Sequence, residues 1–184
     1  MVIEVMGHKA GWLSLYSGVA GGGDVVLLPE IPYSIDSIAR HLQDRAANGK
    51  TFSIVVVAEG ALSVQEAKME RKAFKKARAD MTLSIGYRVA REIEEATGLE
   101  SRVTVLGYLQ RGGTPVAYDR VLASQFGTAA ADMLARGDYG KMVALQDNEI
   151  VGVPLENVAN RIKTVPLDHR MLVTARNVGT CLGD

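Results

Sequence analysis

The strongest constraint on the fold of this chain is the alternation between short apolar runs and longer amphipathic segments. The runs Val25–Leu28 and Phe52–Ala58 are unbroken, which is typical of strands buried on both faces of a parallel sheet. Val2–Met6 and Val103–Leu106 have the same character. The segment from Ser34 to Gly49 repeats apolar residues at helical spacing between a serine that can cap a helix and a glycine that can end it.

Helices are predicted between most of these strands, and the pattern continues toward the end of the chain. The further predicted helices are Gly11 to about Ala20, Ile85 to Ala96, about Arg120 to Arg136, and a short one from Leu155 to Lys163. A strand at Met142–Leu145 is predicted to turn at Asp147-Asn148 into Ile150–Val153. Strands that alternate with helices form βαβ units. The predicted fold is therefore α/β, a three-layer αβα sandwich with a mainly parallel sheet.

Length and charge limit the classes of function. A chain of 184 residues fits one domain. Lys+Arg and Asp+Glu both number 21, so no net field favours nucleic acid or an anionic membrane as a partner. Cys181 is the single cysteine and cannot form an internal disulfide, and no apolar stretch is long enough to span a bilayer. We therefore expect a cytoplasmic protein.

Two segments look like known binding motifs but are interpreted otherwise. Gly21–Gly23 lacks the P-loop pattern and precedes a strand, so it is read as the end of a helix. The basic segment from Arg71 to Arg78 is surrounded by acidic residues, so it is read as the solvated face of a helix. No metal-ligand spacing is found among the three histidines, His8, His41 and His169.

Polar residues cluster at the carboxyl ends of predicted strands, where ligands of parallel sheets bind. A carboxylate at Glu59 can accept sugar hydroxyls, and Arg102 and Arg111 can hold a phosphate. Two alternatives stay open: Glu59 can be a structural partner of a lysine or a helix terminus, and Arg111 can belong to an ordinary surface turn. The candidate rim consists of Gly7-His8-Lys9, Glu59-Gly60 and the segment from Gly107 to Gly113.

Four motifs, in this order and spacing, resemble the carboxyl-terminal half of 6-phosphofructokinase. They are VIEVMGHKAGW, LLPEIP, VVVAEG and RVTVLGYLQRGGTPVAYDRVLA, and the pattern QRGGxPxxxDR is highly specific to that family. The resemblance runs from Val2 to about Arg161. Because of the extra charged segment Gln65–Asp80, the chain resembles the branch of the family that includes pyrophosphate-dependent and mixed-donor enzymes.

The resemblance implies phosphoryl transfer to the 1-hydroxyl of fructose 6-phosphate, which gives fructose 1,6-bisphosphate in glycolysis. Met6, Gly7 and His8 match the family's MGR motif that lines the sugar, with histidine in place of arginine. Glu59 matches the carboxylate that binds sugar hydroxyls, and Arg111 matches an arginine on the 6-phosphate.

Further positions follow from the same resemblance. Arg102 matches an arginine that reaches the phosphate from a neighbouring subunit, which implies a homo-oligomer. Tyr108 stands where many members have histidine. Asp24 and Lys50 match positions of an effector site found in some members, while two other positions of that site depart from the family.

The resemblance also implies that the donor site lies elsewhere. The family's donor loop and catalytic aspartate belong to the amino-terminal half, which would bind Mg²⁺ with ATP or pyrophosphate. Residues 1–184 are accordingly predicted to be the fructose 6-phosphate-binding half, with no catalytic residue and no metal ligand, inactive without the amino-terminal half. A strand that begins at Val2 suggests a chain cut into an existing fold. The alternative is a non-catalytic sugar-phosphate sensor or assembly module.

Overall fold

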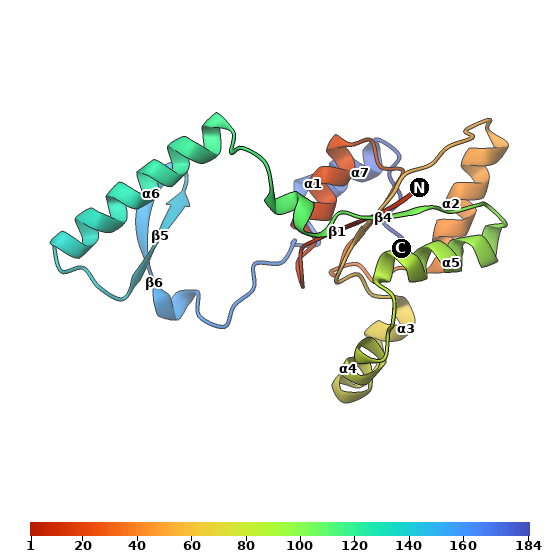
Figure 1. Cartoon of the computed structure of the whole chain (residues 1–184), viewed down its shortest axis with the longest axis horizontal. Helices are drawn as coiled ribbons and strands as arrows, with labels where there is room; N and C mark the ends of the chain where they lie inside the picture. Colours follow the sequence, from red (N-terminus) through yellow and green to blue (C-terminus); the bar gives the residue numbers. More distant parts are fainter. The chain divides into compact units, whose positions relative to one another are not determined.

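A computed structural model describes residues 1–184, which form two compact units (Figure 1). The sheet unit consists of residues 1–110 and 163–184, and the hairpin unit consists of residues 111–162. The chain length alone predicts one domain. The structure has two units because helix α6 (Ala117–Ala135) packs on its own β-hairpin, so that residues 111–162 make most of their contacts among themselves.

The sheet unit is built on four parallel strands in the order β2-β3-β1-β4. The first strand of the sequence is therefore interior, and Val2 is aligned with Val55 on one side and with Val103 on the other. The four strands are β1 (Val2–Val5), β2 (Val25–Leu27), β3 (Val55–Ala58) and β4 (Val103–Val105). The predicted parallel α/β architecture is confirmed.

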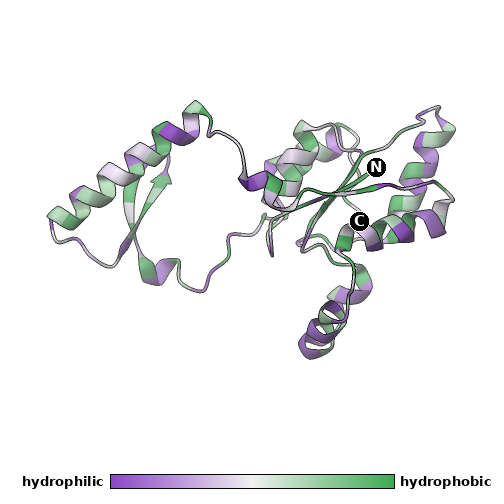
Figure 2. Ribbon diagram, viewed as in Figure 1, coloured by the Kyte–Doolittle hydropathy of each residue, from purple (hydrophilic) through white to green (hydrophobic).

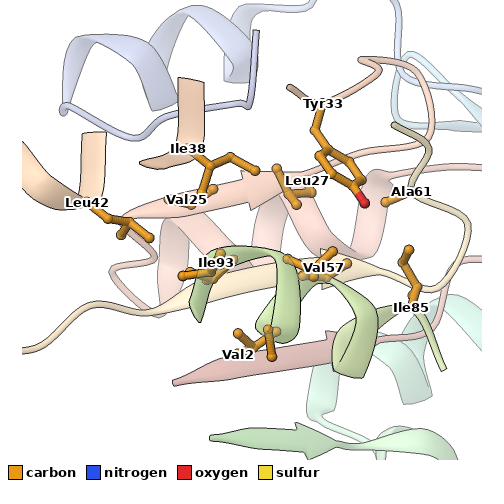
Figure 3. Close-up of a cluster of buried hydrophobic side chains, with 13 residues drawn as sticks. Val2, Val25, Leu27, Tyr33, Ile38, Leu42, Val57, Ala61, Ile85 and Ile93 are labelled. Atoms are coloured by element: carbon orange, nitrogen blue, oxygen red, sulfur yellow. The ribbon is translucent and has the colours of Figure 1, made fainter. Parts of the chain in front are cut away.

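Helices α2 (Ile35–Ala47) and α5 (Ile85–Thr97) cover one face of the sheet. Their apolar side chains meet the valines of the strands in a buried cluster (Figure 3). Ile38 and Ile93 are each almost fully buried in this cluster, as is Tyr33. Burial of each such aliphatic side chain contributes about 1.5–3 kcal/mol relative to exposure.

Helices α1 (Trp12–Ala20) and α7 (Arg170–Asn177) cover the other face, which completes the three layers. Leu15 and Leu172 are buried there against the strands. Gly18 allows α1 to approach β2 closely, because a Cβ at this position would lie 2.4 Å from a methyl group of Val26. Helix α7 has no counterpart among the sequence predictions.

The charged segment after β3 folds as two short helices, α3 (Val64–Ala67) and α4 (Arg71–Ala79). Ser63 and Glu66 form a reciprocal capping box at the start of α3. Helix α4 buries none of its residues, and Figure 2 shows it as predominantly hydrophilic. The predicted solvated helix face is confirmed, with the addition that Arg78 at its end is mostly covered.

Helix ends agree with the predictions in position and differ in one interaction. The glycines at 21–23 end α1, and the amide of Gly23 donates to the carbonyl of Gly18 at 2.7 Å. Ser34 occupies the N-cap of α2 with extended backbone, but its hydroxyl makes no capping hydrogen bond. Its amide donates instead to the carbonyl of Gly183, which ties the helix start to the end of the chain.

The hairpin unit consists of α6 and an antiparallel pair, β5 (Lys141–Gln146) and β6 (Glu149–Pro154). Asp147 and Asn148 both have positive φ, at 49° and 66°, as a two-residue hairpin turn requires. The predicted hairpin is confirmed, and its strands run slightly longer than expected.

Two boundaries in the hairpin unit differ from the predictions. Helix α6 begins at Ala117, three residues before the predicted start at Arg120. The predicted helix from Leu155 to Lys163 is only a single 3-10 turn, η2 (Leu155–Asn157). Leu155 is half-exposed and no residue of η2 is buried, so nothing packs against this segment to extend it.

Candidate functional site

The carboxyl ends of β1 and β3 meet at one edge of the sheet, where Glu59 joins two loops. Its Oε1 accepts a hydrogen bond from the amide of His8 at 2.6 Å and one from the amide of Gly7 at 3.3 Å. The amide of Glu59 donates to the carbonyl of Val5 at 2.9 Å, which continues the pairing of the strands. The structure therefore brings three of the predicted site residues, Gly7, His8 and Glu59, together.

The turn after β1 requires unusual backbone conformations. Gly7 has φ 148° and His8 has φ 52°, a left-handed conformation that is uncommon for a residue with a side chain. Gly60 is essential to this approach, since a Cβ there would lie 1.9 Å from the carbonyl oxygen of His8. The hydrogen bonds that the Gly7 and His8 amides donate to Glu59 hold this strained turn, and such strain is often found at functional sites.

Neither structural alternative for Glu59 describes its surroundings. The carboxylate forms no ion pair with a lysine and no bond to a helix terminus. Oε1 is used by the two amides, while Oε2 makes no hydrogen bond within the chain. A partly buried carboxylate with one oxygen fixed and the other free is suited to accept a hydroxyl group from a ligand.

A depression of about 520 Å³ lies beside Glu59, within the sheet unit. We call it the rim depression. Its polar side chains can donate or accept hydrogen bonds, and its apolar side chains form a surface on which a sugar ring can lie. The lining residues are His8, Lys9, Pro29, Glu59, Gly60, Leu62, Phe74 and Arg78.

Arg78 belongs to a buried ionic network that the sequence analysis did not anticipate. Glu66 accepts hydrogen bonds from Arg88 at 2.7 Å on each oxygen and lies 3.1 Å from Nε of Arg78. The hydroxyl of Tyr33 donates to Glu92 and accepts from Arg88. This network fixes α4 to α5. It depends on side-chain contacts that form only in the folded chain, so spacing along the sequence could not have identified it.

The network sets the ionisation of its members. Burial alone would raise the pKa of Glu66, but the hydrogen bonds from Arg88 and from the Ser63 amide, with the charges of both arginines, hold this pKa below its ordinary value. Burial raises the pKa of Tyr33, and the charge of Glu92 adds to this rise. Burial lowers the pKa of Arg78 although the charge of Glu66 opposes the shift. The guanidinium of Arg78 nevertheless stays cationic, because arginine is not deprotonated in proteins.

Gln110 connects the end of β1 to the QRGG motif. Its Oε1 accepts from the amide of Met6 at 3.2 Å, and its Nε2 donates to the carbonyl of Gly107 at 3.2 Å. Met6 is thus positioned by its backbone next to η1 (Gly107–Arg111). The sequence places this glutamine within the QRGG motif but gives no signal for its role, because that role depends on the direction of its side chain.

Tyr108 and Arg111 are both exposed residues of η1. The phenol ring of Tyr108 has no partner in the chain that would fix it, and 83% of the residue is accessible. Arg111 ends η1 and is the first residue of the hairpin unit. Its side chain is exposed, so its five N–H donors are accessible to a ligand.

Arg102 lies at the opposite edge of the sheet from Glu59. It precedes β4 at the amino end, and the amide of Val2 donates to its carbonyl at 2.7 Å. Glu59 follows β3 at the carboxyl end, and the intervening strand length is about 10–13 Å. The Arg102 side chain is exposed and pairs with Glu100 at 3.1 Å. Within one chain, Arg102 and Glu59 do not belong to one site.

The two candidate effector positions differ in their surroundings. Asp24 pairs with Arg45 at 2.7 Å and accepts from the amide of Ile54 at 2.8 Å, so its carboxylate is used within the fold. Lys50 is exposed and lines a separate depression of about 340 Å³. Asp24 does not line that depression, and the structure therefore does not bring the pair into one pocket.

The chain contains neither a cluster of metal-ligating side chains nor a membrane-spanning helix. No group of three or more His, Cys, Asp or Glu side chains is arranged to hold a metal ion. None of the helices is both long enough and apolar enough to cross a bilayer. We therefore derive no chemical step through a metal held by these residues.

The parallel αβα sandwich places the class of the protein as α/β, with its candidate ligand site at the strand ends, where ligands of such sheets bind. A family model described as Phosphofructokinase matches residues 1–134 of the chain. The chain belongs to the phosphofructokinase family.

Curated relatives include enzymes with two kinds of phosphoryl donor. The chain is 64% identical over 185 residues to an ATP-dependent 6-phosphofructokinase of Spirochaeta thermophila, covering all of this chain and 50% of that protein. It is 48% identical over 168 residues to a pyrophosphate--fructose 6-phosphate 1-phosphotransferase of Amycolatopsis methanolica, covering 90% of this chain and 49% of that protein. The chain spans about half the length of the curated relatives it matches.

Solved structures agree with the fold. Phosphofructokinase from Pichia pastoris in the T-state matches with a TM-score of 0.67 and 32% identity, over 85% of this chain and 16% of that one. A pyrophosphate-dependent phosphofructokinase from Nitrosospira multiformis matches with a TM-score of 0.72 and 21% identity, over 100% of this chain and 48% of that one. The second likeness concerns the fold alone.

Proposed function

We propose that residues 1–184 form the acceptor-binding half of a 6-phosphofructokinase, which transfers a phosphoryl group to the 1-hydroxyl of fructose 6-phosphate. The observation that carries the proposal is the state of Glu59. Two backbone amides fix one of its oxygens, and the other is free beside a depression large enough for a hexose. A carboxylate held in this way can accept two sugar hydroxyls without reorganising.

The remaining contacts follow from the same proposal. Met6, Gly7 and His8 form the backbone edge of the sugar site, and Tyr108 is available as a hydroxyl donor. Arg111 binds the 6-phosphate, for which its unpaired guanidinium is suited by its planar set of donors. Gly113, with φ 88°, lets the chain turn away after this arginine.

We assign the binding site for the phosphoryl donor to the half of the relatives that this chain does not cover. The residues of this chain do not fit a Mg²⁺ site, so Mg²⁺ with ATP or pyrophosphate is proposed to bind to that half. Relatives named for either donor match this chain, which is why its residues do not decide between the two. We expect no turnover from the 184-residue chain alone with either donor.

Arg102 supports a homo-oligomer as the working form. Its guanidinium lies at the edge opposite to Glu59, so it can serve a sugar-phosphate site only in a neighbouring copy. Dilution to the monomer should therefore weaken binding of fructose 6-phosphate. Equal affinity in the monomer and the oligomer would remove Arg102 from the site.

The test of the proposed function is calorimetric titration of the chain with fructose 6-phosphate. Unphosphorylated fructose and the Arg111→Ala variant are the controls, and Arg161→Ala is a matched exposed arginine of the hairpin unit. The proposal predicts binding of the phosphorylated sugar alone, lost in Arg111→Ala and retained in Arg161→Ala. Equal binding by fructose, or unchanged binding by Arg111→Ala, would contradict it.

A further inference from the structure

Arg78, in the wall of the rim depression, has hydrogen-bonding capacity that the fold does not use. Nη2 donates to the carbonyl of Ala61 and lies 3.4 Å from Oε2 of Glu66. Nε is buried 3.1 Å from Glu66 without a hydrogen bond of acceptable geometry, so Nη1, which makes no hydrogen bond, is the donor left for a ligand. A guanidinium that retains free donors next to a depression is available to a ligand.

Glu66 does not neutralise Arg78 completely, because it is shared. Arg88 takes both oxygens of Glu66 at 2.7 Å, and Arg88 also lies 3.6 Å from Glu92. Arg78 keeps only the longer contacts with the same carboxylate. Phe74 lies under the guanidinium, with its ring centre 5.3 Å from Cζ of Arg78, and holds the group in place. Arg78 is thus both positioned and incompletely paired.

The neighbours of Arg78 define the ligand chemistry. Lys9 and His8 line the same depression and add donors, while the free oxygen of Glu59 requires a hydroxyl group. A bare phosphate would be repelled by Glu59, and a bare sugar would leave the arginine unused. The depression therefore fits a phosphorylated sugar that presents a hydroxyl and a phosphate side by side.

We propose that Arg78, together with Lys9, binds the 1-phosphate of fructose 1,6-bisphosphate, the group that the transfer reaction creates. This inference rests on the proposed function. The 6-phosphate is already assigned to Arg111, so the donors of Arg78 serve a second phosphate. Arg78 is then a binding residue for the product end of the reaction, on a helix that buries none of its residues.

The test compares two ligands on the 184-residue chain by calorimetric titration. The wild-type chain should bind fructose 1,6-bisphosphate about tenfold more tightly than fructose 6-phosphate, the effect of one charge-assisted phosphate contact. In Arg78→Met this ratio should fall to near one while the affinity for fructose 6-phosphate stays within about twofold. Arg78→Lys, which keeps the charge, should retain part of the ratio. Arg91→Met, an exposed arginine on α5, should leave it unchanged.

Each other outcome decides against the inference. An unchanged ratio in Arg78→Met, with normal fructose 6-phosphate binding, would remove Arg78 and leave the proposed function standing. An equal loss of both ligands would show that Arg78 acts through packing. Failure of the wild-type chain to bind fructose 6-phosphate would overturn the proposed function together with this inference. Where Arg78→Met does not fold, Lys9→Met, on an exposed residue of the same depression, must lower the ratio instead.

Discussion

At the scale of single residues, Glu59 and Glu66 show how two carboxylates in one region take different roles. Glu66 is used on both oxygens by Arg88, Arg78 and the amide of Ser63. Glu59 is used on one oxygen only. A saturated carboxylate stabilises the fold, whereas a half-used one retains capacity for a ligand. The free oxygen is therefore a better guide to function here than burial is.

The first prediction concerns Glu59→Gln. The amide oxygen can still accept from Gly7 and His8, but the second oxygen becomes an N–H group that cannot accept a sugar hydroxyl. We expect affinity for fructose 6-phosphate to fall about tenfold or more in calorimetric titration, with little change in the unfolding temperature. Glu95→Gln, on an exposed carboxylate of α5, is the control. Binding equal to that of the wild type would exclude Glu59 from the sugar site.

The second prediction concerns Glu66 and acid. The pKa of this carboxyl is lowered from its ordinary value of 4.5, so its stabilising contribution is present above that pH and is lost as the pH falls through the lowered folded value. Glu66→Gln should therefore reduce the free energy of unfolding by about 3 kcal/mol at pH 7, since it removes the charged partner of two partly buried arginines. The difference from the wild type should shrink below pH 4.5.

Urea unfolding, followed by fluorescence of Trp12, measures this difference, because Trp12 is the only tryptophan and lies in the sheet unit. Glu70→Gln, on an exposed neighbour of Glu66, is the matched control and should show no such pH dependence. A difference that stays constant from pH 7 to pH 3 would mean that the charge of Glu66 does not stabilise the fold.

At the scale of elements, the contact between α1 and β2 depends on the absence of a side chain at Gly18. In a solvent-exposed helix, Gly→Ala usually stabilises by about 0.5–1 kcal/mol. Gly18→Ala should have the opposite sign and destabilise the sheet unit by about 1–3 kcal/mol, because the new Cβ would lie 2.4 Å from Val26.

The measurement is again unfolding followed by Trp12 fluorescence. Ser17→Ala, an exposed neighbour on the same helix, should change stability by less than about 0.5 kcal/mol. A stabilising effect of Gly18→Ala would show that the helix can move away from the strand at little cost.

Elements with strong local signals were predictable from the sequence, and those that depend on distant partners were not. The run Val55–Ala58 is apolar at every position, so its identity as a buried strand follows directly. Helix α7 is short and is held in place by packing on α1, a contact between segments that are about 160 residues apart. Tertiary contact, not local pattern, determines such an element.

The candidate site likewise has features that the sequence predicts and features that depend on contacts in the folded chain. That the ends of β1 and β3 lie at one edge follows from parallel pairing, and the structure brings Gly7, His8 and Glu59 together there. The role of Gln110 and the sharing of Glu66 by two arginines depend on side-chain directions that no spacing rule supplies. The functional roles of the site residues stay predictions.

At the scale of the whole molecule, the two units differ in how much of their chain is buried. The sheet unit contains two clusters of buried hydrophobic residues, whereas Met133 is the only buried residue of the hairpin unit. Val121 and Leu134 of α6 are both exposed. The hairpin unit alone therefore has little core to stabilise it.

We expect hydrogen exchange to reflect this difference. Amides of β3 should exchange most slowly, and amides of α6 should exchange faster by at least about tenfold, because local opening of the hairpin unit exposes little apolar surface. Mass spectrometry of peptides after exchange separates the two units, with exposed α4 of the sheet unit as an internal reference for fast exchange. Equal protection in β3 and α6 would show that the hairpin unit is stabilised by something beyond its own core.

The interior position of β1 has a consequence for the order in which the protein can form. On the ribosome, Val2–Val5 is made before both of its neighbours in the sheet, Val55–Ala58 and Val103–Val105. This strand therefore has no hydrogen-bonding partner in the sheet until Val55–Ala58 is made, and it has both partners only after Val103–Val105 is made. Such long-range closure slows folding, so the rim at the carboxyl end of β1 depends on strand pairing between residues about 50 to 100 positions apart.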